Sequence, residues 1–252
     1  MRYFIELRYK GAAYCGWQRQ NDVPSVQQTL ERALSTLLRA ETEIVGAGRT
    51  DTGVNASYYV AHFDTETAIA DTQQLVYKLN LILPDDIAVF AVKEVSPEAH
   101  ARFDAVRREY RYYVEQSKNP FTRDGSWQYY VSLDLDAMNR AAESLFRYED
   151  FTSFAKLNSN NKTNICRVMK AHWSVEADGV LVFTIRADRF LRNMVRSIVG
   201  TLVDVGRGRY SVEEFCNIVE ARNLSLSSAG APAQGLFLSD VVYPKEIFNK
   251  TI

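Results

Sequence analysis

Cysteine and histidine are both scarce in this chain of 252 residues, which has three of each. The cysteines are odd in number and far apart, which argues against a disulfide framework or a cysteine-based zinc site and indicates a reducing, cytoplasmic environment. The histidines form no local pattern with a serine, cysteine or aspartate, so acid–base chemistry is expected from a carboxylate, a tyrosine or water. His62 lies in an alternating, strand-like stretch and is interpreted as a structural residue.

Long apolar runs are also absent. No uninterrupted apolar stretch approaches the ~18 residues that indicate a membrane span, and charges from Arg2 and Glu6 onward argue against a secretory signal peptide. The composition, 46% hydrophobic and 24% charged, is that of an ordinary globular protein. The length allows one large domain or two smaller ones. The sequence therefore predicts a soluble protein of the cytoplasm.

A net charge of −1 gives the whole chain no electrostatic preference for nucleic acid, but its arginines are unevenly distributed. Only Asp188 and Asp204 oppose the six arginines between positions 186 and 209, and a second cluster surrounds a tyrosine-rich segment. Each arginine alone is interpreted as a solvated surface charge, whereas two clusters interleaved with aromatic residues favour a face that binds a polyanion. The clusters are Arg186, Arg189, Arg192, Arg196, Arg207 and Arg209, and Arg102, Arg107, Arg108 and Arg111.

Hydrophobic periodicity predicts strands and helices in both halves of the chain. Strands are indicated at 2–9, 42–45, 58–63, 87–95, 109–114 and 236–242, with a hairpin over 166–185 turned at Asp178-Gly179. Helices are indicated at 26–38, 72–81, 136–146 and 190–205, and after Ser211, which forms a capping box with Glu214. This order predicts an α+β duplication, with halves at 1–104 and 105–252 that share a sheet or cleft.

The stretch from Gly46 to Ala56 carries the strongest candidate for chemistry. Its three glycines favour tight turning and the close approach of another molecule. Between the last two glycines, four consecutive residues supply a guanidinium, a carboxylate and two hydroxyls. Asp51 can be a loop cap or a surface charge, but Arg49 two residues away favours the ionised carboxylate that a nucleophile or a base requires.

The triplet Asp51-Thr52-Gly53 also matches the Asp-Thr-Gly turn of aspartic proteases. Those enzymes need two such aspartates that share a proton, whereas this chain has one copy. In addition, the protease turn follows apolar strand residues, whereas the residues before this triplet are Arg49 and Thr50. Because the triplet alone is weak, a protease is an alternative with little support.

A longer match surrounds this triplet. Residues 48–56, Gly-Arg-Thr-Asp-Thr-Gly-Val-Asn-Ala, resemble the Gly-Arg-Thr-Asp-Ala-Gly-Val-His-Ala signature of the tRNA pseudouridine synthase A family, with seven of nine positions alike. Further segments resemble landmarks of that family in the same order along the chain. They are residues 9–11, 14–18, 100–103, 108–112, 150–154, 190–200 and 235–238.

The resemblance implies an isomerase that converts uridine to pseudouridine at positions 38, 39 and 40 in the anticodon stem-loop of tRNA. It implies a homodimer that needs no metal, nucleotide or redox cofactor. It also implies the pseudouridine synthase fold, in which two ferredoxin-like α/β halves share a mainly antiparallel sheet around a central cleft. The partner of the protein is then tRNA, and no membrane is involved.

The resemblance assigns roles to five residues. Asp51 matches the essential aspartate, which acts as nucleophile or as base at the sugar, and Arg196 matches the arginine that pairs with it. Tyr110 matches a tyrosine that stacks on the uracil and approaches proton-transfer positions. Arg49 matches a residue that enters the space of the flipped-out nucleotide, and Leu236 matches an apolar residue of the uracil pocket. Without the resemblance, Tyr110 fits equally well as a cross-strand aromatic, and Leu236 as a core residue.

Two positions depart from the family signature. Thr52 stands where the family has alanine, and Asn55 where it has histidine. Both changes leave the aspartate and the arginine in place, so we expect them to affect RNA contacts more than catalysis. The candidate RNA contacts are Asn55, Arg107, Arg108, Arg189 and Arg192. A non-catalytic RNA-binding module is a second alternative, because it would use the same basic, aromatic face.

Overall fold

The computed structural model describes residues 1–156 and 162–248 and divides the chain into two compact units. Unit 1 consists of residues 1–106 and the C-terminal residues from Leu238 onward, and unit 2 is Arg107–Phe237. The division after residue 106 lies close to the expected one after 104. The C-terminal segment belongs to unit 1, which corrects the expectation that residues 105–252 form one half.

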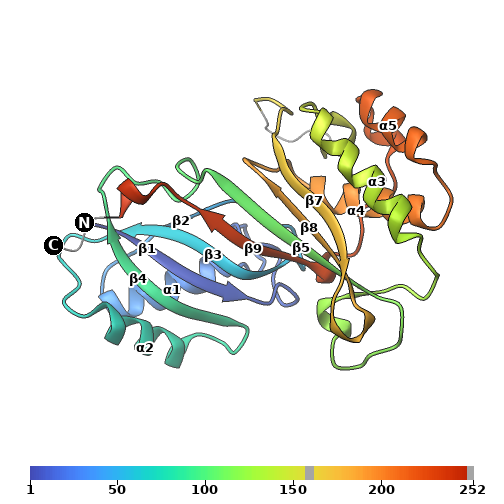
Figure 1. The fold of residues 1–252 in the computed structure, drawn as a ribbon. Coiled ribbons are helices and arrows are strands. Elements are labelled where there is room, and N and C mark those ends of the chain that lie inside the picture. Colours follow the sequence, from blue (N-terminus) through green and yellow to red (C-terminus); the bar gives the residue numbers. More distant parts are fainter. Residues whose placement is uncertain (157–161, 249–252) are drawn as a thin grey trace. The chain divides into compact units, whose positions relative to one another are not determined.

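Unit 1 is an antiparallel sheet with two helices on one face (Figure 1). Its strand order is β4-β1-β3, and β2 pairs with the end of β3. This βαββαβ succession, with β1 and β3 in the centre, is the ferredoxin-like arrangement. Along the chain the elements are β1 (Arg2–Tyr9), α1 (Val26–Leu38), β2 (Ile44–Gly46), β3 (Asn55–Asp64), α2 (Thr72–Ile82) and β4 (Ile87–Val95).

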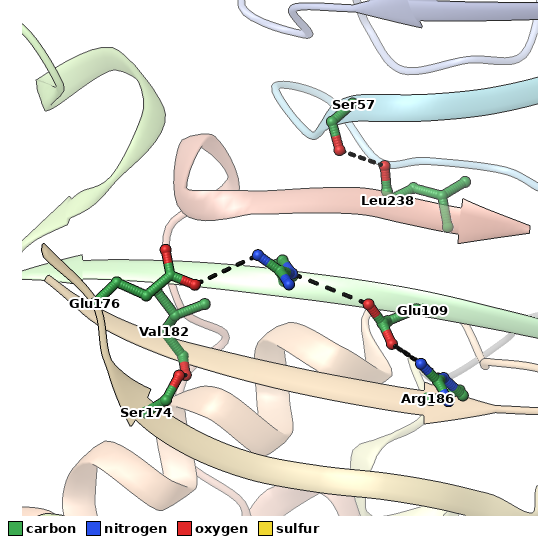
Figure 2. A network of polar contacts seen from close by, with 8 residues as sticks. Ser57, Glu109, Ser174, Glu176, Val182, Arg186 and Leu238 are labelled. Carbon is green, nitrogen blue, oxygen red and sulfur yellow. Dashed lines mark hydrogen bonds and ion pairs between the residues drawn. The ribbon is translucent and has the colours of Figure 1, made fainter.

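The C-terminal segment belongs to unit 1 because it packs against β1, whose side chains are buried on both faces of the sheet. Residues 3–7 are all buried, whereas a strand with one solvated face alternates. The Tyr243 ring packs edge-on against Phe4, with centroids 4.9 Å apart, and the Tyr243 hydroxyl donates to the Ala101 carbonyl at 2.6 Å. The Ser57 hydroxyl donates to the carbonyl of Leu238 at 3.4 Å (Figure 2).

Unit 2 contains a second antiparallel set of strands, in the order β5-β8-β7, with three helices packed together. The short strand β6 pairs in parallel with the end of β5. The last strand, β9, begins in unit 2 and continues into unit 1. The elements are β5 (Arg107–Glu115), β6 (Trp127–Gln128), α3 (Leu135–Ser144), β7 (Val168–Val175), β8 (Leu181–Ala187), α4 (Met194–Gly206), α5 (Val212–Glu220) and β9 (Leu236–Val242). The expected α+β class with mainly antiparallel strands is confirmed.

The bounds of most helices and strands lie within a few residues of those predicted from the sequence. Ser211 and Glu214 form the expected capping box of α5, and the β7–β8 hairpin turns through Asp178 and Gly179, both with positive φ. Helix α4 begins at Met194, four residues later than expected, because Asn193 has a left-handed φ of 64° that a helix cannot continue through. Among the described residues, no helix is long and apolar enough to cross a membrane.

An asparagine covers part of the outer strand in each unit. In unit 1, the Asn80 amide of α2 donates to the Val89 carbonyl of β4 at 2.6 Å and accepts from the Val89 N–H at 2.8 Å. In unit 2, the Asn139 amide of α3 makes the same pair with Trp173 of β7, at 3.1 and 2.8 Å. Each side chain thus takes the place of a neighbouring strand and blocks pairing with another chain.

We expect Asn139→Ala to lower the free energy of unfolding by about 1–2 kcal/mol, because two hydrogen bonds to the β7 backbone are lost. Urea unfolding measures this change. The exposed edge should also promote self-association, seen by size-exclusion chromatography at rising concentration. Arg140→Ala, at the exposed neighbouring position, is the control. Equal stability and equal elution of the two variants would show that the amide does not protect the edge.

His62 has the structural place expected for it. Its side chain is 4% exposed, and Nδ1 accepts from the Ala101 N–H at 3.1 Å. The ring of His100 packs edge-on against it, with centroids 4.7 Å apart. Burial, followed by the positive charge of Arg2, lowers the pKa of His62 to about 4.

Unit 1 should therefore lose stability in mild acid. Between pH 6.5 and 4 the unfolded chain binds a proton at His62 that the folded chain does not, so the free energy of unfolding falls by about 3 kcal/mol over this range. Above pH 6.5 this contribution is fully present and constant. Urea titrations at a series of pH values measure it. In His62→Gln the slope should become clearly shallower, and the part that remains comes from groups such as His100, whose pKa burial also lowers. His172→Gln, at an exposed histidine, should keep the wild-type slope.

Candidate active site

Three buried aromatic side chains support the loop that carries Asp51, residues 47–54, which we call the Asp51 loop. Trp17 stacks on Tyr59 with centroids 4.0 Å apart, and Tyr9 contacts both rings. The Tyr59 hydroxyl donates to the Gly48 carbonyl, and the hydroxyls of Tyr9 and Thr50 lie 2.8 Å apart. The residues before and after Arg49, Gly48 and Thr50, are therefore both hydrogen-bonded to the tyrosines of this aromatic cluster.

A second segment, residues 10–17, is bonded to the Asp51 loop. The N–H of Trp17 donates to the Thr50 carbonyl at 3.2 Å. A Cβ on Gly16, whose φ is +94°, would lie 2.4 Å from that carbonyl oxygen, and a Cβ on Gly11 would lie 2.1 Å from the Val54 oxygen. Only glycine permits this approach at both positions. The Asp51 loop is therefore held on two sides, which is the preorganisation that a catalytic carboxylate needs.

Arg49 and Asp51 differ in how far their side chains are exposed to solvent. The N–H of Val54 donates to the Asp51 carbonyl at 3.1 Å and closes a turn in which Gly53 has the positive φ of +77°. At the head of this turn Asp51 is half-buried, whereas Arg49 and Thr52 are exposed. The neighbouring Gly48 has open space where a Cβ would stand. Both predicted residues are thus accessible on one loop of unit 1.

Asn55 occupies a different place from the one expected of an RNA contact. Its side chain is 2% exposed, and its Oδ1 accepts from the Gly11 N–H at 2.8 Å. This bond joins the end of the Asp51 loop to the segment that carries Gly11 and Gly16. The structure gives Asn55 a supporting role in the loop, and we remove it from the candidate RNA contacts.

In unit 2, Tyr110 is a half-buried residue of β5, in register with Ile185 of β8. Phe190, from the turn before α4, packs edge-on against it with centroids 5.1 Å apart and an interplanar angle of 89°. This contact fixes the plane of the tyrosine ring while part of the ring stays accessible. Such a ring is suited to stacking on a base.

Tyr112, two residues further along β5, links the other predicted residues of unit 2. Its buried hydroxyl donates to the Pro232 carbonyl at 2.8 Å, and a Cβ on Gly235, next to Leu236, would lie 2.8 Å from its ring. Burial raises the pKa of Tyr112, and the positive charge of Arg196 acts in the opposite direction. Within unit 2, Tyr112 therefore lies two residues from Tyr110 in β5, close enough to Arg196 to be affected by its charge, and against Gly235, the residue before Leu236. Leu236 itself is 5% exposed.

The arginine clusters are more neutralised than the sequence suggested. Glu109, 8% exposed, accepts from Arg186 at 2.5 Å and lies 4.0 Å from Arg111, which also pairs with Glu176 at 3.4 Å (Figure 2). Asp204 pairs with Arg207 and Arg209 at 3.5 and 3.1 Å. Four of the ten arginines in the two clusters are therefore paired with carboxylates, and one of these carboxylates, Asp204, is among the two that the sequence places within the first cluster.

The remaining candidate RNA contacts lie in unit 2. Arg192 is exposed in the turn before α4, whereas Arg107, Arg108 and Arg189 are half-buried. Arg108 donates to the Asp188 carbonyl at 3.0 Å. Among the residues that the structure describes, no group of three or more histidine, cysteine, aspartate or glutamate side chains is placed to hold a metal ion.

Comparison with known proteins identifies the family. Residues 141–244 match the family model described as tRNA pseudouridine synthase. The chain is 53% identical to the tRNA pseudouridine synthase A of Bacteroides fragilis over 98% of both chains. It is 49% identical to that of Porphyromonas gingivalis, over 98% of this chain and 99% of the relative, and 39% identical to that of Colwellia psychrerythraea, over 97% and 95%. The chain therefore belongs to the tRNA pseudouridine synthase A family, which is a family of isomerases.

Proposed function

We propose that this protein converts uridine to pseudouridine at positions 38, 39 and/or 40 in the anticodon stem-loop of tRNA. Family membership over nearly the whole chain supports the reaction class. The observation that carries the proposal is the Asp51 loop, in which a half-buried carboxylate and an exposed guanidinium stand on a rigid support. The positions within tRNA follow from the resemblance of residues 48–56 to the family signature.

The reaction is an isomerisation of one nucleotide. The bond between N1 of uracil and C1′ of ribose breaks, the base turns, and a bond forms between C5 and C1′. C5 loses a proton and N1 gains one, so atoms and electrons balance without a redox partner. What the protein supplies is a group that acts at the sugar, a surface that holds the detached base, and a route for the proton.

In this proposal Asp51 acts at the sugar as nucleophile or base, and Arg196 pairs with it and orients it. Tyr110 stacks on the uracil and takes part in proton transfer, and Leu236 lines the uracil pocket. Arg49 enters the space that the flipped-out nucleotide leaves. Flipping costs a few kcal/mol, which charged and planar contacts offset.

The RNA contacts are proposed for Arg107, Arg108, Arg189 and Arg192. Arginine suits this task because its planar group binds phosphate through paired donors and stacks on bases. A homodimer would let each anticodon arm contact basic residues of two chains, which fits a chain of net charge −1. We place the reaction in the cytoplasm, and in this proposal it requires no metal or other cofactor.

Tritium release tests the reaction itself. A tRNA transcript labelled with tritium at C5 of uridine loses tritium to water only when the C5–C1′ bond forms. We expect release by the purified protein to reach one to three equivalents per tRNA. A transcript with cytidine at positions 38–40 should release none. Equal release from both transcripts would contradict the positions, and no release from either would contradict the activity.

A further inference from the structure

A run of small residues crosses one face of helix α4. Residues 227–232, Ser-Ser-Ala-Gly-Ala-Pro, which we call the strap, are bonded to three buried polar side chains of the helix. The Ser197 hydroxyl donates to that of Ser227 at 3.1 Å, and the Ser228 N–H donates to the Thr201 hydroxyl at 3.2 Å. The Ser228 hydroxyl donates to the Asp204 carboxylate at 2.5 Å. Because Ser197, Thr201 and Asp204 are three or four residues apart, they lie on one face of α4, and the strap is bonded to that face.

Two glycines let the strap lie directly on the helix. A Cβ on Gly200 of α4 would stand 2.2 Å from the Ala229 carbonyl oxygen, and a Cβ on Gly230 would stand 3.0 Å from Oδ1 of Asn193. The first of these distances is too short for any side chain, and the obstacle is backbone rather than a movable group. The position of the strap is therefore set by the helix surface itself.

Near its C-terminal end, at Ala231, the strap is hydrogen-bonded to Arg196. The Nε of Arg196 donates to the Ala231 carbonyl at 2.6 Å, and the Ala231 N–H donates to the Arg196 carbonyl at 2.9 Å. The next carbonyl, that of Pro232, accepts from the Tyr112 hydroxyl at 2.8 Å. A guanidinium is planar, so a fixed Nε–H also fixes the direction of the two terminal nitrogens, which carry its other four N–H groups.

We propose that the strap is the positioning element of Arg196. It sets the plane of the guanidinium and ties the helix that carries Arg196 to the strand that carries Tyr110. The strap does not touch the reacting atoms; it acts through Arg196. The proposal rests on the function proposed above, in which Arg196 orients the Asp51 carboxylate. A displacement of about 1 Å in such a group is enough to slow a reaction about 100-fold.

Gly200→Ala tests the proposal, with Gly206→Ala as its matched control. Both substitutions add a methyl group to a buried glycine of α4. At Gly200 the methyl group meets the strap backbone, whereas at Gly206 it meets the flexible side chain of Met138, 2.4 Å away. We expect Gly200→Ala to lower kcat about 10- to 100-fold with KM for tRNA within about twofold of wild type. Gly206→Ala should keep kcat within about twofold, and thermal melts report the stability of both variants.

The same substitution in an Arg196→Lys background separates positioning from general damage. If the strap acts through Arg196, Gly200→Ala should change kcat less than about twofold in a protein that has no guanidinium to orient. An equal loss in both backgrounds would show that the strap affects the site by another route. A milder variant keeps the proposal testable if Gly200→Ala fails to fold: Ser228→Ala should lower kcat about fivefold, and Ser228→Thr, which keeps the hydroxyl, should restore it.

Failure of this proposal can be told apart from failure of the proposed function. If Arg196→Met is inactive while Gly200→Ala has the kcat of Gly206→Ala, the positioning role of the strap is overturned and the role of Arg196 stands. If Arg196→Met is fully active, the proposed role of Arg196 is wrong, and the strap has no guanidinium of catalytic importance to position.

Discussion

Asp51→Asn should lower kcat by about 10³-fold or more while the protein stays folded and binds tRNA with near-normal affinity. Asparagine has the size of aspartate, but its neutral amide can act neither as nucleophile nor as base at the sugar. The turn of the Asp51 loop should persist, because the Val54 N–H bonds to the backbone carbonyl of residue 51. Single-turnover tritium release measures the rate, and filter binding measures the affinity.

Asp85→Asn is the control, because it makes the same change of charge at an exposed position of unit 1. It should keep the wild-type rate. An Asp51→Asn protein that releases tritium within tenfold of the wild-type rate would remove Asp51 from the chemistry. A wild-type protein that binds tRNA but modifies no uridine would favour the non-catalytic RNA-binding module instead.

Arg196→Met has the second largest expected effect, a loss of kcat of about 10²- to 10⁴-fold. Methionine keeps an apolar stem on a helix whose neighbouring residues Val195 and Ile198 are buried, so the fold should tolerate it. Loss of the bond from Nε to the Ala231 carbonyl should cost about 1–3 kcal/mol of unfolding free energy. The proposed pair with Asp51 is lost as well, and the carboxylate is then free to turn.

Rates and thermal melts of Arg196→Met should be compared with those of Arg147→Met, at an exposed arginine of unit 2. The control should match wild type in both measurements. A stable Arg196→Met protein with wild-type turnover would show that this arginine only packs the helix.

The residues of the candidate site could be predicted from the sequence because their chemistry is local. A carboxylate, a guanidinium and glycines within eight residues are visible in the chain, and the resemblance named Tyr110 and Arg196 as their partners. The support of the Asp51 loop could not be predicted. Tyr9, Trp17 and Tyr59 lie far apart in sequence, and strand alternation alone does not show that their rings meet beneath residue 48.

Long-range contacts explain the differences between expectation and structure. Helix α4 starts late because Asn193 adopts a left-handed backbone, and the strap residue Gly230 lies beside the Asn193 side chain. The basic clusters are partly neutralised because Glu109 meets Arg186 from another strand. The sequence predicts the C-terminal strand at 236–242, but a predicted strand does not say which sheet it joins. The protease alternative finds no support, since the relatives that match nearly the whole chain carry the name tRNA pseudouridine synthase A.

The most direct test of the central claim is a map of pseudouridine in a tRNA transcript that has been incubated with the purified protein. Carbodiimide modification followed by primer extension stops at each pseudouridine. The account predicts time-dependent stops at position 38, 39 or 40 with the wild-type protein and none with Asp51→Asn. Complete absence of stops in the anticodon arm, or stops only elsewhere in the tRNA, would contradict it.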